Sequence, residues 1–267
     1  MPRFSYVHLY GEPSSRTLKM EEVADYVRNL VDCDVDVRKE FFSYFLKFDE
    51  TDRIAQRVAS TRVLDIRKPF ITYEPSSLEI DFEKTVILTP NKRFLGILYD
   101  GFEIQKIYNE LVPEEENNLD HVHILLTNRL ICTYSENDLR YHYRTIICGY
   151  PTIICTSGIV EAPARPKEFY LLMQYYTSLG NTNFDEIKTR FEGRFIDYDD
   201  FRFTEVVKGF VLQGLFYYIT GNAFCDKKEC RLFNAHWQED MIEAQLNNGN
   251  LCNEHLKFLH DFNILES

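Results

Sequence analysis

The first half of the chain alternates between two kinds of hydrophobic pattern. Residues 4–10 alternate apolar and polar positions, which is typical of a strand with one buried face. Apolar residues recur at helical spacing over residues 18–31 and favour an amphipathic helix. Short apolar runs at residues 85–90 and 94–99 are typical of buried strands. The prolines and serines of residues 69–82 predict a loop with short extended pieces.

Strands and helices continue to alternate through the middle of the chain, and helices follow. We expect further strands at residues 34–37, 121–127, 143–148 and 152–156, and further helices at residues 41–48, 51–59, 102–111, 168–178, 184–195, 203–220 and 256–262. Gly221 stands where a glycine often ends a helix. The pattern predicts an α/β sheet domain over residues 1–180 and a helical C-terminal subdomain over residues 181–267.

Composition narrows the class of protein. The 267 residues are 45% hydrophobic, as in globular proteins, and carry a net charge of −12, which disfavours binding to nucleic acids and anionic lipids. No apolar run approaches the roughly 18–20 residues of a membrane span, and the first residues lack the apolar stretch of a signal peptide. No glycine-rich nucleotide-binding loop and no serine-hydrolase elbow is present. We therefore expect a soluble, cytoplasmic protein that does not bind membranes.

The seven cysteines fall into two groups. An odd number without an export signal argues against a disulfide framework. Cys33, Cys132, Cys148 and Cys155 stand singly and are expected to be buried free thiols. The other three lie close together near the C-terminus, together with a histidine.

The spacing of this second group predicts a metal site. Cys225 and Cys230 are separated by four residues, and Cys252 and His255, after 21 further residues, by two. Zinc takes four such ligands in a tetrahedron at about 2.0–2.3 Å, and two short chelate loops supply them with little loss of chain entropy. We expect one structural zinc with no open coordination position. The alternative is three unrelated buried thiols and a surface histidine.

The same stretch resembles the archaemetzincins, a family of metzincin-type zinc proteins. The core of that family reads His-Glu-x-x-His-x-x-Gly-x-x-His-Cys-x4-Cys-x-Met and is followed by a Cys-x-x-Cys pair. The corresponding residues here are Gly221, Cys225, Cys230, Leu232, Cys252 and His255, with histidine replacing the last cysteine. The stretch is still more similar to an uncharacterised, mainly archaeal group of archaemetzincin-like proteins described as metallopeptidases.

The resemblance implies a fold and a role for the cysteines. The fold would be a metzincin-like mixed sheet with flanking helices and a helical C-terminal part clamped by a non-catalytic zinc. Residues 203–220 would form the active-site helix, and residues 146–157 look like the edge of the sheet above the cleft. Cys225, Cys230, Cys252 and His255 would hold the zinc.

The chain departs from the family at the catalytic motif. The two histidines and the glutamate of that motif fall on Gly214, Leu215 and Tyr218, and the third histidine falls on Phe224. None of these side chains binds zinc as an imidazole does, and a leucine cannot act as a general base. No other His-Glu-x-x-His is present. The sequence therefore predicts no catalytic residue, a former site that is packed core, and a relative of the metallopeptidases that does not cleave peptides.

Other residues offer alternative sites. His121 and His123 point to one face of a predicted strand and can share a metal. His142 and His236 are further candidate ligands, and Glu161, Glu239 and Asp240 can supply a carboxylate. Each such histidine is more often a structural residue with a hydrogen-bond partner.

Three functional hypotheses follow. The first is a cleft that binds a peptide or protein segment against the sheet edge without cutting it. The second is a hydrolase whose metal is held by His121, His123 or His142. The third is a zinc-knuckle module that binds RNA or a ribonucleoprotein, with the pairs Lys227 and Lys228, and Arg140 and Arg144, as its basic surface.

Overall fold

The computed structural model describes residues 4–180 and 184–264. Its strands are β1 (Tyr6–Tyr10), β2 (Asp34–Arg38), β3 (Leu98–Asp100), β4 (His121–Thr127), β5 (Leu130–Ser135), β6 (Arg140–Tyr143), β7 (Ile146–Ile147) and β8 (Thr152–Cys155). Its helices are α1 (Met20–Arg28), α2 (Phe41–Phe45), α3 (Thr51–Ala59), α4 (Ser77–Leu88), α5 (Gly101–Leu111), α6 (Thr156–Glu161), α7 (Lys167–Ser178), α8 (Asp185–Arg190), α9 (Phe203–Thr220), α10 (Gln238–Ile242) and α11 (Asn253–Ile264). A 3-10 turn covers Phe48–Glu50 and a π-helix covers Glu243–Asn248.

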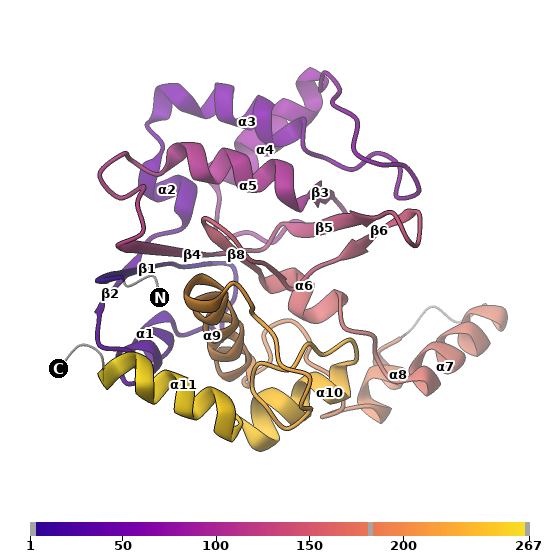
Figure 1. Ribbon diagram of the computed structural model, residues 1–267. Helices are drawn as coiled ribbons and strands as arrows, with labels where there is room; N and C mark the ends of the chain where they lie inside the picture. Colours follow the sequence, from indigo (N-terminus) through magenta and orange to yellow (C-terminus); the bar gives the residue numbers. More distant parts are fainter. Residues whose placement is uncertain (1–3, 181–183, 265–267) are drawn as a thin grey trace.

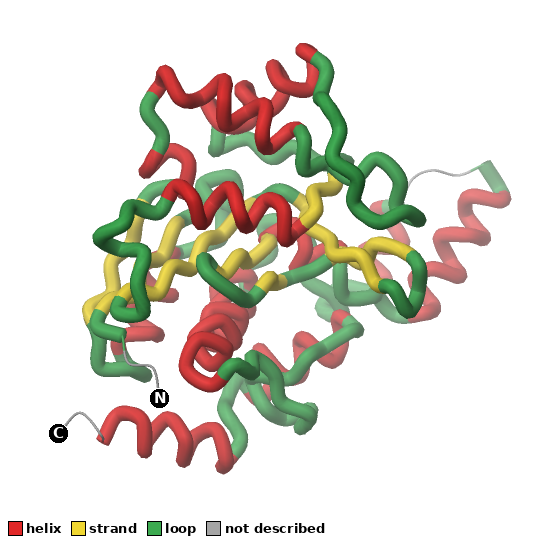
Figure 2. Tube along the Cα trace, turned by 45° about the horizontal axis from the view of Figure 1, so that its top comes forward, coloured by secondary structure: helices red, strands yellow, loops and turns green. Residues whose placement is uncertain are grey.

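The strands form two mixed sheets within the described residues. The larger has the order β2-β1-β4-β8-β7, in which all neighbours are parallel except β7, which pairs antiparallel with β8 at one edge. The smaller has the order β3-β5-β6, with β6 antiparallel to β5. The strands lie in one layer between two sets of helices (Figure 2). This arrangement confirms the predicted α/β class with a mixed sheet and flanking helices.

A separate hydrophobic core covers each face of the larger sheet. In Figure 1, α3, α4 and α5 lie above the strands, and α1, α9 and α11 lie below them. Val7 and Leu9 of β1 point into the core on the α9 side, whereas Tyr10 points into the core on the α5 side. The core on the α9 side joins residues from both sides of the predicted domain boundary at residue 180. Residues 181–183 lie outside the described residues, and the boundary itself stays a prediction.

Residues 77–88 form the helix α4, so the strand predicted at residues 85–90 is wrong. The loop predicted at residues 69–82 holds for residues 69–76, which lie outside helices and strands, and is wrong for the rest. The helix α4 begins with a capping box, in which the Ser76 N–H donates to Glu79 Oε2 at 2.8 Å and the Glu79 N–H donates to Ser76 Oγ at 3.4 Å. The two bonds satisfy backbone N–H groups that a helix start leaves open. They start a helix ahead of the apolar run, which then continues it to Leu88.

Two other predicted strands are shorter than expected. Of residues 94–99, only the end belongs to β3, and Leu95 is exposed. Residues 143–148 contain the end of one strand and the whole of another, because the chain changes sheets there. Tyr143 pairs with Cys132 in the smaller sheet, and Ile146 pairs with Ile154 in the larger. The predicted helix over 184–195 ends at Arg190, whereas the helices predicted at 102–111, 168–178 and 203–220 agree with α5, α7 and α9 within one residue.

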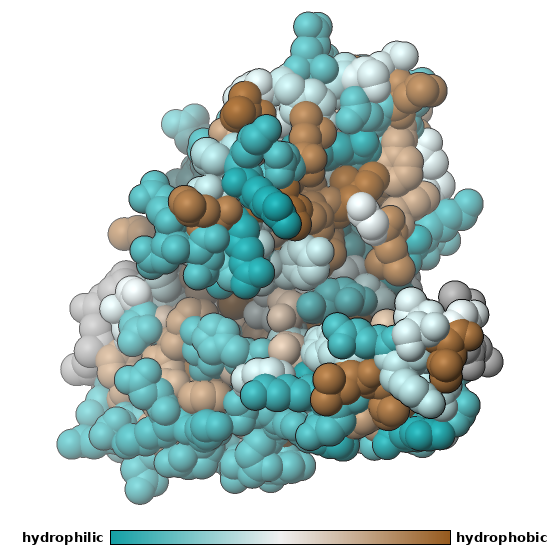
Figure 3. All heavy atoms as spheres, turned by 90° about the vertical axis from the view of Figure 1, so that its right-hand side faces the viewer, coloured by the Kyte–Doolittle hydropathy of each residue, from teal (hydrophilic) through white to brown (hydrophobic). Residues whose placement is uncertain are grey.

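The side of the molecule that carries β6 and α7 is hollowed (Figure 3). Viewed from the side of β6 and α7, the molecule is indented between its upper and lower parts, and apolar side chains lie on both parts (Figure 3). None of the helices in the described parts of the chain is long and apolar enough to cross a bilayer.

The helix α9 packs closely against the larger sheet. A Cβ atom added to Gly214 would lie 3.0 Å from Thr152 Cγ2 on β8, so the absence of a side chain there permits the close approach. Leu215 is 1% exposed and belongs to the core. The helix ends at Gly221, whose φ of 76° is left-handed and whose N–H donates to the Tyr217 carbonyl at 2.7 Å. Tight packing therefore occupies the part of α9 that the resemblance aligns with a catalytic motif.

We expect Leu215→Ala to lower the free energy of unfolding by about 2–5 kcal/mol, because it leaves a cavity in a fully packed core. The matched control is Leu171→Ala on α7, where the leucine is 65% exposed and the change is expected to stay within about 0.5 kcal/mol. Urea unfolding followed by circular dichroism measures both. Equal effects at the two positions would show that Leu215 is not packed as described.

Candidate metal centre

The structure brings the four predicted zinc ligands together. Cys225 and Cys230 lie in the segment after α9, Cys252 directly precedes α11, and His255 lies in its first turn. One ligand atom from each of the four lies within 4.8 Å of the other three. His255 Nδ1 is 3.1 Å from Cys252 Sγ and 3.7 Å from Cys230 Sγ. We call these four residues the Cys3His cluster.

Backbone hydrogen bonds fold the two halves of this cluster toward each other. The Cys225 N–H donates to the Leu232 carbonyl at 3.0 Å, and the Cys230 N–H donates to the Lys227 carbonyl at 2.9 Å, so the first half is a closed turn. The Arg231 N–H donates to the Asn250 carbonyl at 2.8 Å and joins this turn to the chain just before Cys252. Backbone hydrogen bonds therefore bring the two ligand pairs toward each other.

A buried arginine ties the cluster to α9. The guanidinium of Arg231 donates to Glu205 Oε1 on α9 and to the Gly249 carbonyl, at 2.5 and 2.9 Å. Gln245 of the π-helix donates to the Arg231 carbonyl at 2.8 Å. A Cβ atom added to Gly209 of α9 would lie 1.6 Å from Gln245 Oε1, so the π-helix can pack here only against a glycine.

The electrostatics differ among the sulfur atoms. Burial raises the pKa of the Cys230 thiol to about 12. Burial acts in the same direction on Cys252, but hydrogen bonds, above all from the backbone N–H of His255, outweigh it and hold the pKa of the Cys252 thiol below its ordinary value. Burial lowers the pKa of His255, which keeps its imidazole neutral. A neutral imidazole and a stabilised thiolate are the forms that bind metals.

The donor set fits zinc. Bond lengths of about 2.0–2.3 Å in a tetrahedron place sulfur and nitrogen ligands about 3.6 Å apart, close to the distances within the cluster. Three sulfur atoms and one imidazole complete four-coordination without water. This cluster can therefore bind a metal ion and, when it does so, leaves no coordination position for a substrate.

The positions that align with the catalytic motif hold no metal ligands. Gly214 and Leu215 are buried against the sheet, and the Tyr218 hydroxyl donates to the Leu119 carbonyl at 2.7 Å. Phe224 packs against the core on the α9 side and also lines a groove. These four side chains supply neither a metal ligand of the histidine or carboxylate type nor a general base.

The groove beside Phe224 follows the edge of the larger sheet. It has a volume of about 320 Å³ and is lined by β7, by Tyr143 at the end of β6, and by residues 234–236. In the described part of the chain, β7 pairs with β8 on one side only. The groove thus runs along an edge strand next to the segment that carries the Cys3His cluster.

The other residues that the sequence offered as metal ligands lie outside the Cys3His cluster and in more than one part of the structure. His121 and His123 lie on β4 beside His8 of β1. His142 Nε2 contacts Asp138 Oδ2 at 2.8 Å, and His236 is exposed; both line a second cavity, of about 540 Å³, next to the groove. Glu161, Glu239 and Asp240 contact Tyr198, Arg194 and Lys228, respectively.

In a second group of potential ligands, sequence reasoning named His123 but missed His8 and Glu116. His8, Glu116 and His123 each place one ligand atom within 4.8 Å of the other two. His8 stands in the alternating pattern of the first strand, but only the order of the strands in the sheet shows that this strand lies beside residues 121–127. Glu116 comes from a run of acidic residues that reads as a solvated loop.

Comparison with known proteins gives one family and two remote structures. Residues 3–262 match the model of a family described as "Probable metallopeptidase family (DUF6775)". No curated protein matches the chain. The structure of archaemetzincin from Methanopyrus kandleri aligns with a TM-score of 0.43 and 9% identity, over 100% of this chain and 97% of that one.

A zinc-dependent peptidase from Methanocorpusculum labreanum (strain Z) aligns with a TM-score of 0.40 and 9% identity, over 95% of this chain and 98% of that one. Likeness at this level adds nothing to the family assignment, which rests on the family model. That model covers nearly the whole chain and confirms the relationship inferred from the sequence. The chain belongs to the probable metallopeptidase family.

Proposed function

We propose that this protein is a member of the metallopeptidase family that binds an extended peptide or protein segment without cleaving it. The Cys3His cluster holds one structural zinc, and the groove along β7 receives the segment. The observation that carries the proposal is the contrast between the two halves of the family motif. Its four thiol and imidazole ligands converge, whereas its catalytic positions hold glycine, leucine, tyrosine and phenylalanine.

The role of the zinc follows from its ligands. Four protein ligands exclude water from the ion, so the ion cannot generate a hydroxide nucleophile or polarise a substrate carbonyl. Its four bonds would join the segment after α9 to the start of α11, across 21 residues that separate the two ligand pairs. Such a link stabilises the folded chain because the unfolded chain cannot hold the ion in the same way.

The peptide-binding role follows from the edge of the sheet. An exposed edge strand offers backbone donors and acceptors to an added strand, and a neighbouring groove supplies contacts to its side chains. Here Ile146 and Ile147 of β7 line the groove together with Tyr143 and Phe224. The polar rim includes Arg144, whose Nε donates to Thr133 Oγ1 at 2.7 Å.

We expect Cys252→Ala to lose one zinc per chain relative to the unmodified protein. The melting temperature is expected to fall on the order of 10 °C, because metal binding and folding are linked. Cys148→Ala is the control, since Cys148 is a partly buried cysteine outside the cluster. Elemental analysis and thermal unfolding measure the two effects. Unchanged zinc content in Cys252→Ala would contradict the assignment of the ligands.

We expect the zinc-loaded chain to leave fluorescein-labelled β-casein, an unfolded polypeptide, uncut and to bind it in a fluorescence anisotropy assay. Tyr143→Ala is expected to weaken this binding about tenfold, as loss of an aromatic contact does at an interface. Tyr170→Ala on α7 is the matched control, because both tyrosines are 43% exposed and Tyr170 lies outside the groove.

Three results would overturn the proposal. Casein cleavage that a chelator abolishes would show an active peptidase. Equal binding by Tyr143→Ala and Tyr170→Ala, or no binding by the unmodified chain, would remove the groove as the binding surface.

A further inference from the structure

Polar side chains occupy part of the sheet face that points away from α9. In the register of the strands, Asp36 on β2, His8 on β1 and His123 on β4 lie side by side. Side chains alternate between the two faces along each strand, and the neighbouring Val7 and Val122 point into the core on the α9 side. The polar group therefore lies on the opposite face from the core that contains Cys225 and Cys230.

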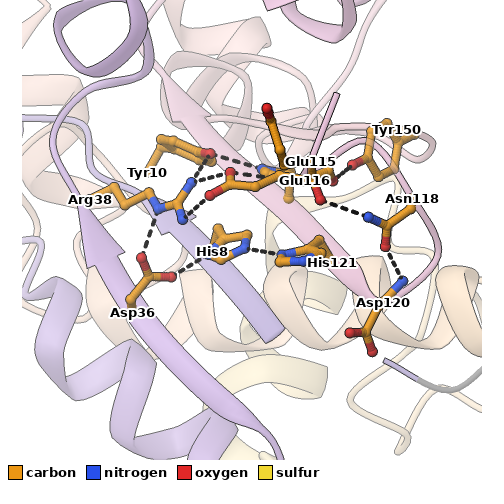
Figure 4. Close-up of polar contacts among 11 residues, drawn as sticks. His8, Tyr10, Asp36, Arg38, Glu115, Glu116, Asn118, Asp120, His121 and Tyr150 are labelled. Atoms are coloured by element: carbon orange, nitrogen blue, oxygen red, sulfur yellow. Dashed lines mark hydrogen bonds and ion pairs between the residues drawn. The ribbon is translucent and has the colours of Figure 1, made fainter. Parts of the chain in front are cut away.

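Two histidines and a glutamate converge at this place. One ligand atom each from His8, Glu116 and His123 lies within 4.8 Å of the other two, and His123 Nε2 is 3.9 Å from Glu116 Oε2. Both imidazole rings are buried, whereas the Glu116 side chain is 23% exposed. His121 lies next to them, with its Nδ1 2.8 Å from His8 Nε2 (Figure 4). Two imidazoles and a carboxylate are a ligand set that zinc and other first-row metals accept.

The second nitrogen of each ring already has a partner. His8 Nδ1 contacts Asp36 Oδ1 at 2.5 Å, and His123 Nδ1 contacts the Tyr10 hydroxyl at 2.8 Å. Metal-binding histidines usually hold their other nitrogen in this way, by a carboxylate or another polar group, which orients the ring. The Nε2 atoms of both rings are thus the ones directed toward the metal position.

The charges around the rings favour a cation. Arg38 donates to Asp36 Oδ2 at 2.7 Å and to the two Glu116 oxygens at 2.6 and 2.8 Å, so one positive charge faces two negative ones. Arg38 therefore compensates only half of this negative charge, and a cation bound beside Glu116 compensates the rest. Each carboxylate oxygen has two lone pairs, so Glu116 can bind an ion while Arg38 remains in place.

We infer that His8, His123 and Glu116 form a second metal site, which binds a divalent first-row transition metal such as Zn²⁺. The ligands are the Nε2 atoms of the two histidines and a carboxylate oxygen of Glu116, and the fourth position lies beside His121. The site uses nitrogen and oxygen ligands only and contains no residue of the Cys3His cluster or of the groove. It is therefore independent of the proposed function.

The test is a zinc count on matched variants. The purified chain is dialysed against a small excess of Zn²⁺, separated from unbound metal by gel filtration, and measured by elemental analysis. We expect two zinc ions per unmodified chain, one in His123→Gln, and two in His260→Gln, which changes an exposed histidine of α11. Glu116→Gln alters a partly exposed ligand without disturbing a buried ring, and is expected to bind the second ion at least about tenfold more weakly.

Cobalt separates loss of the site from loss of the fold. When Co²⁺ replaces Zn²⁺ during growth, the Cys3His cluster gives an intense thiolate-to-cobalt absorption band, whereas a site of nitrogen and oxygen ligands does not. His123→Gln is expected to keep this band and to lose one cobalt ion.

The competing arrangement is a metal-free hydrogen-bond network, in which His123 Nε2 donates to the Glu116 carbonyl at 3.2 Å and the His8 ring is held between Asp36 and His121. One metal ion in the unmodified chain, or equal counts in His123→Gln and His260→Gln, would establish that network and overturn the inference. Either result would leave the Cys3His assignment intact. Conversely, if Cys148→Ala binds two ions and Cys252→Ala binds one, the ion that remains in Cys252→Ala is the one at the second site, and the inference is supported.

Discussion

The close approach of α9 to the larger sheet is the contact that holds the C-terminal part of the chain, with its cysteine cluster, against the strands. Gly214 lies against Thr152 without room for a side chain, and Leu215 is enclosed in the core beside it. This contact fills the place of a catalytic motif with packed atoms. It also fixes the end of α9 at Gly221, from which the chain enters the turn that carries the first two thiols. A side chain at position 214 would press against Thr152 of β8, so the glycine there suits the close packing of the helix on the sheet.

The sheet separates two clusters of different chemistry. On the α9 side, the ligand atoms of three cysteines and one histidine lie within 4.8 Å of one another, a donor set that zinc accepts in a tetrahedron. On the other side, two imidazoles and a carboxylate lie beneath the segment that precedes β4, and Arg38 and Asp36 surround them. The first set comes from the last fifty residues, whereas the second combines His8 of β1 with Glu116 and His123, which lie more than a hundred residues further along the chain.

This difference explains how much the sequence could predict. The Cys3His cluster could be predicted because two short sequence spacings keep the members of each ligand pair close together in any fold. The amphipathic helices could be predicted from the local periodicity of apolar residues. His8 and His123 become neighbours only through the order β2-β1-β4, which no local pattern determines. The strand predicted at residues 85–90 failed because the capping box at Ser76 and Glu79 starts a helix, and an apolar run of that length fits either structure. The division of residues 143–148 between two sheets likewise depends on partners that are remote in the sequence.

The wall that β7 gives to the groove forms independently of the catalytic motif, of which only the position of Phe224 lines the groove. The strand β7 exists because the chain leaves the smaller sheet at Tyr143 and joins the larger one at Ile146. That change of sheet is determined by backbone pairing with β5 and β8, and no residue of the catalytic motif takes part in it. Apolar residues on α9 and an edge strand at β7 are therefore two separate consequences of the fold. The proposed binding of a peptide segment rests on the second of them, and the proposed absence of cleavage rests on the first.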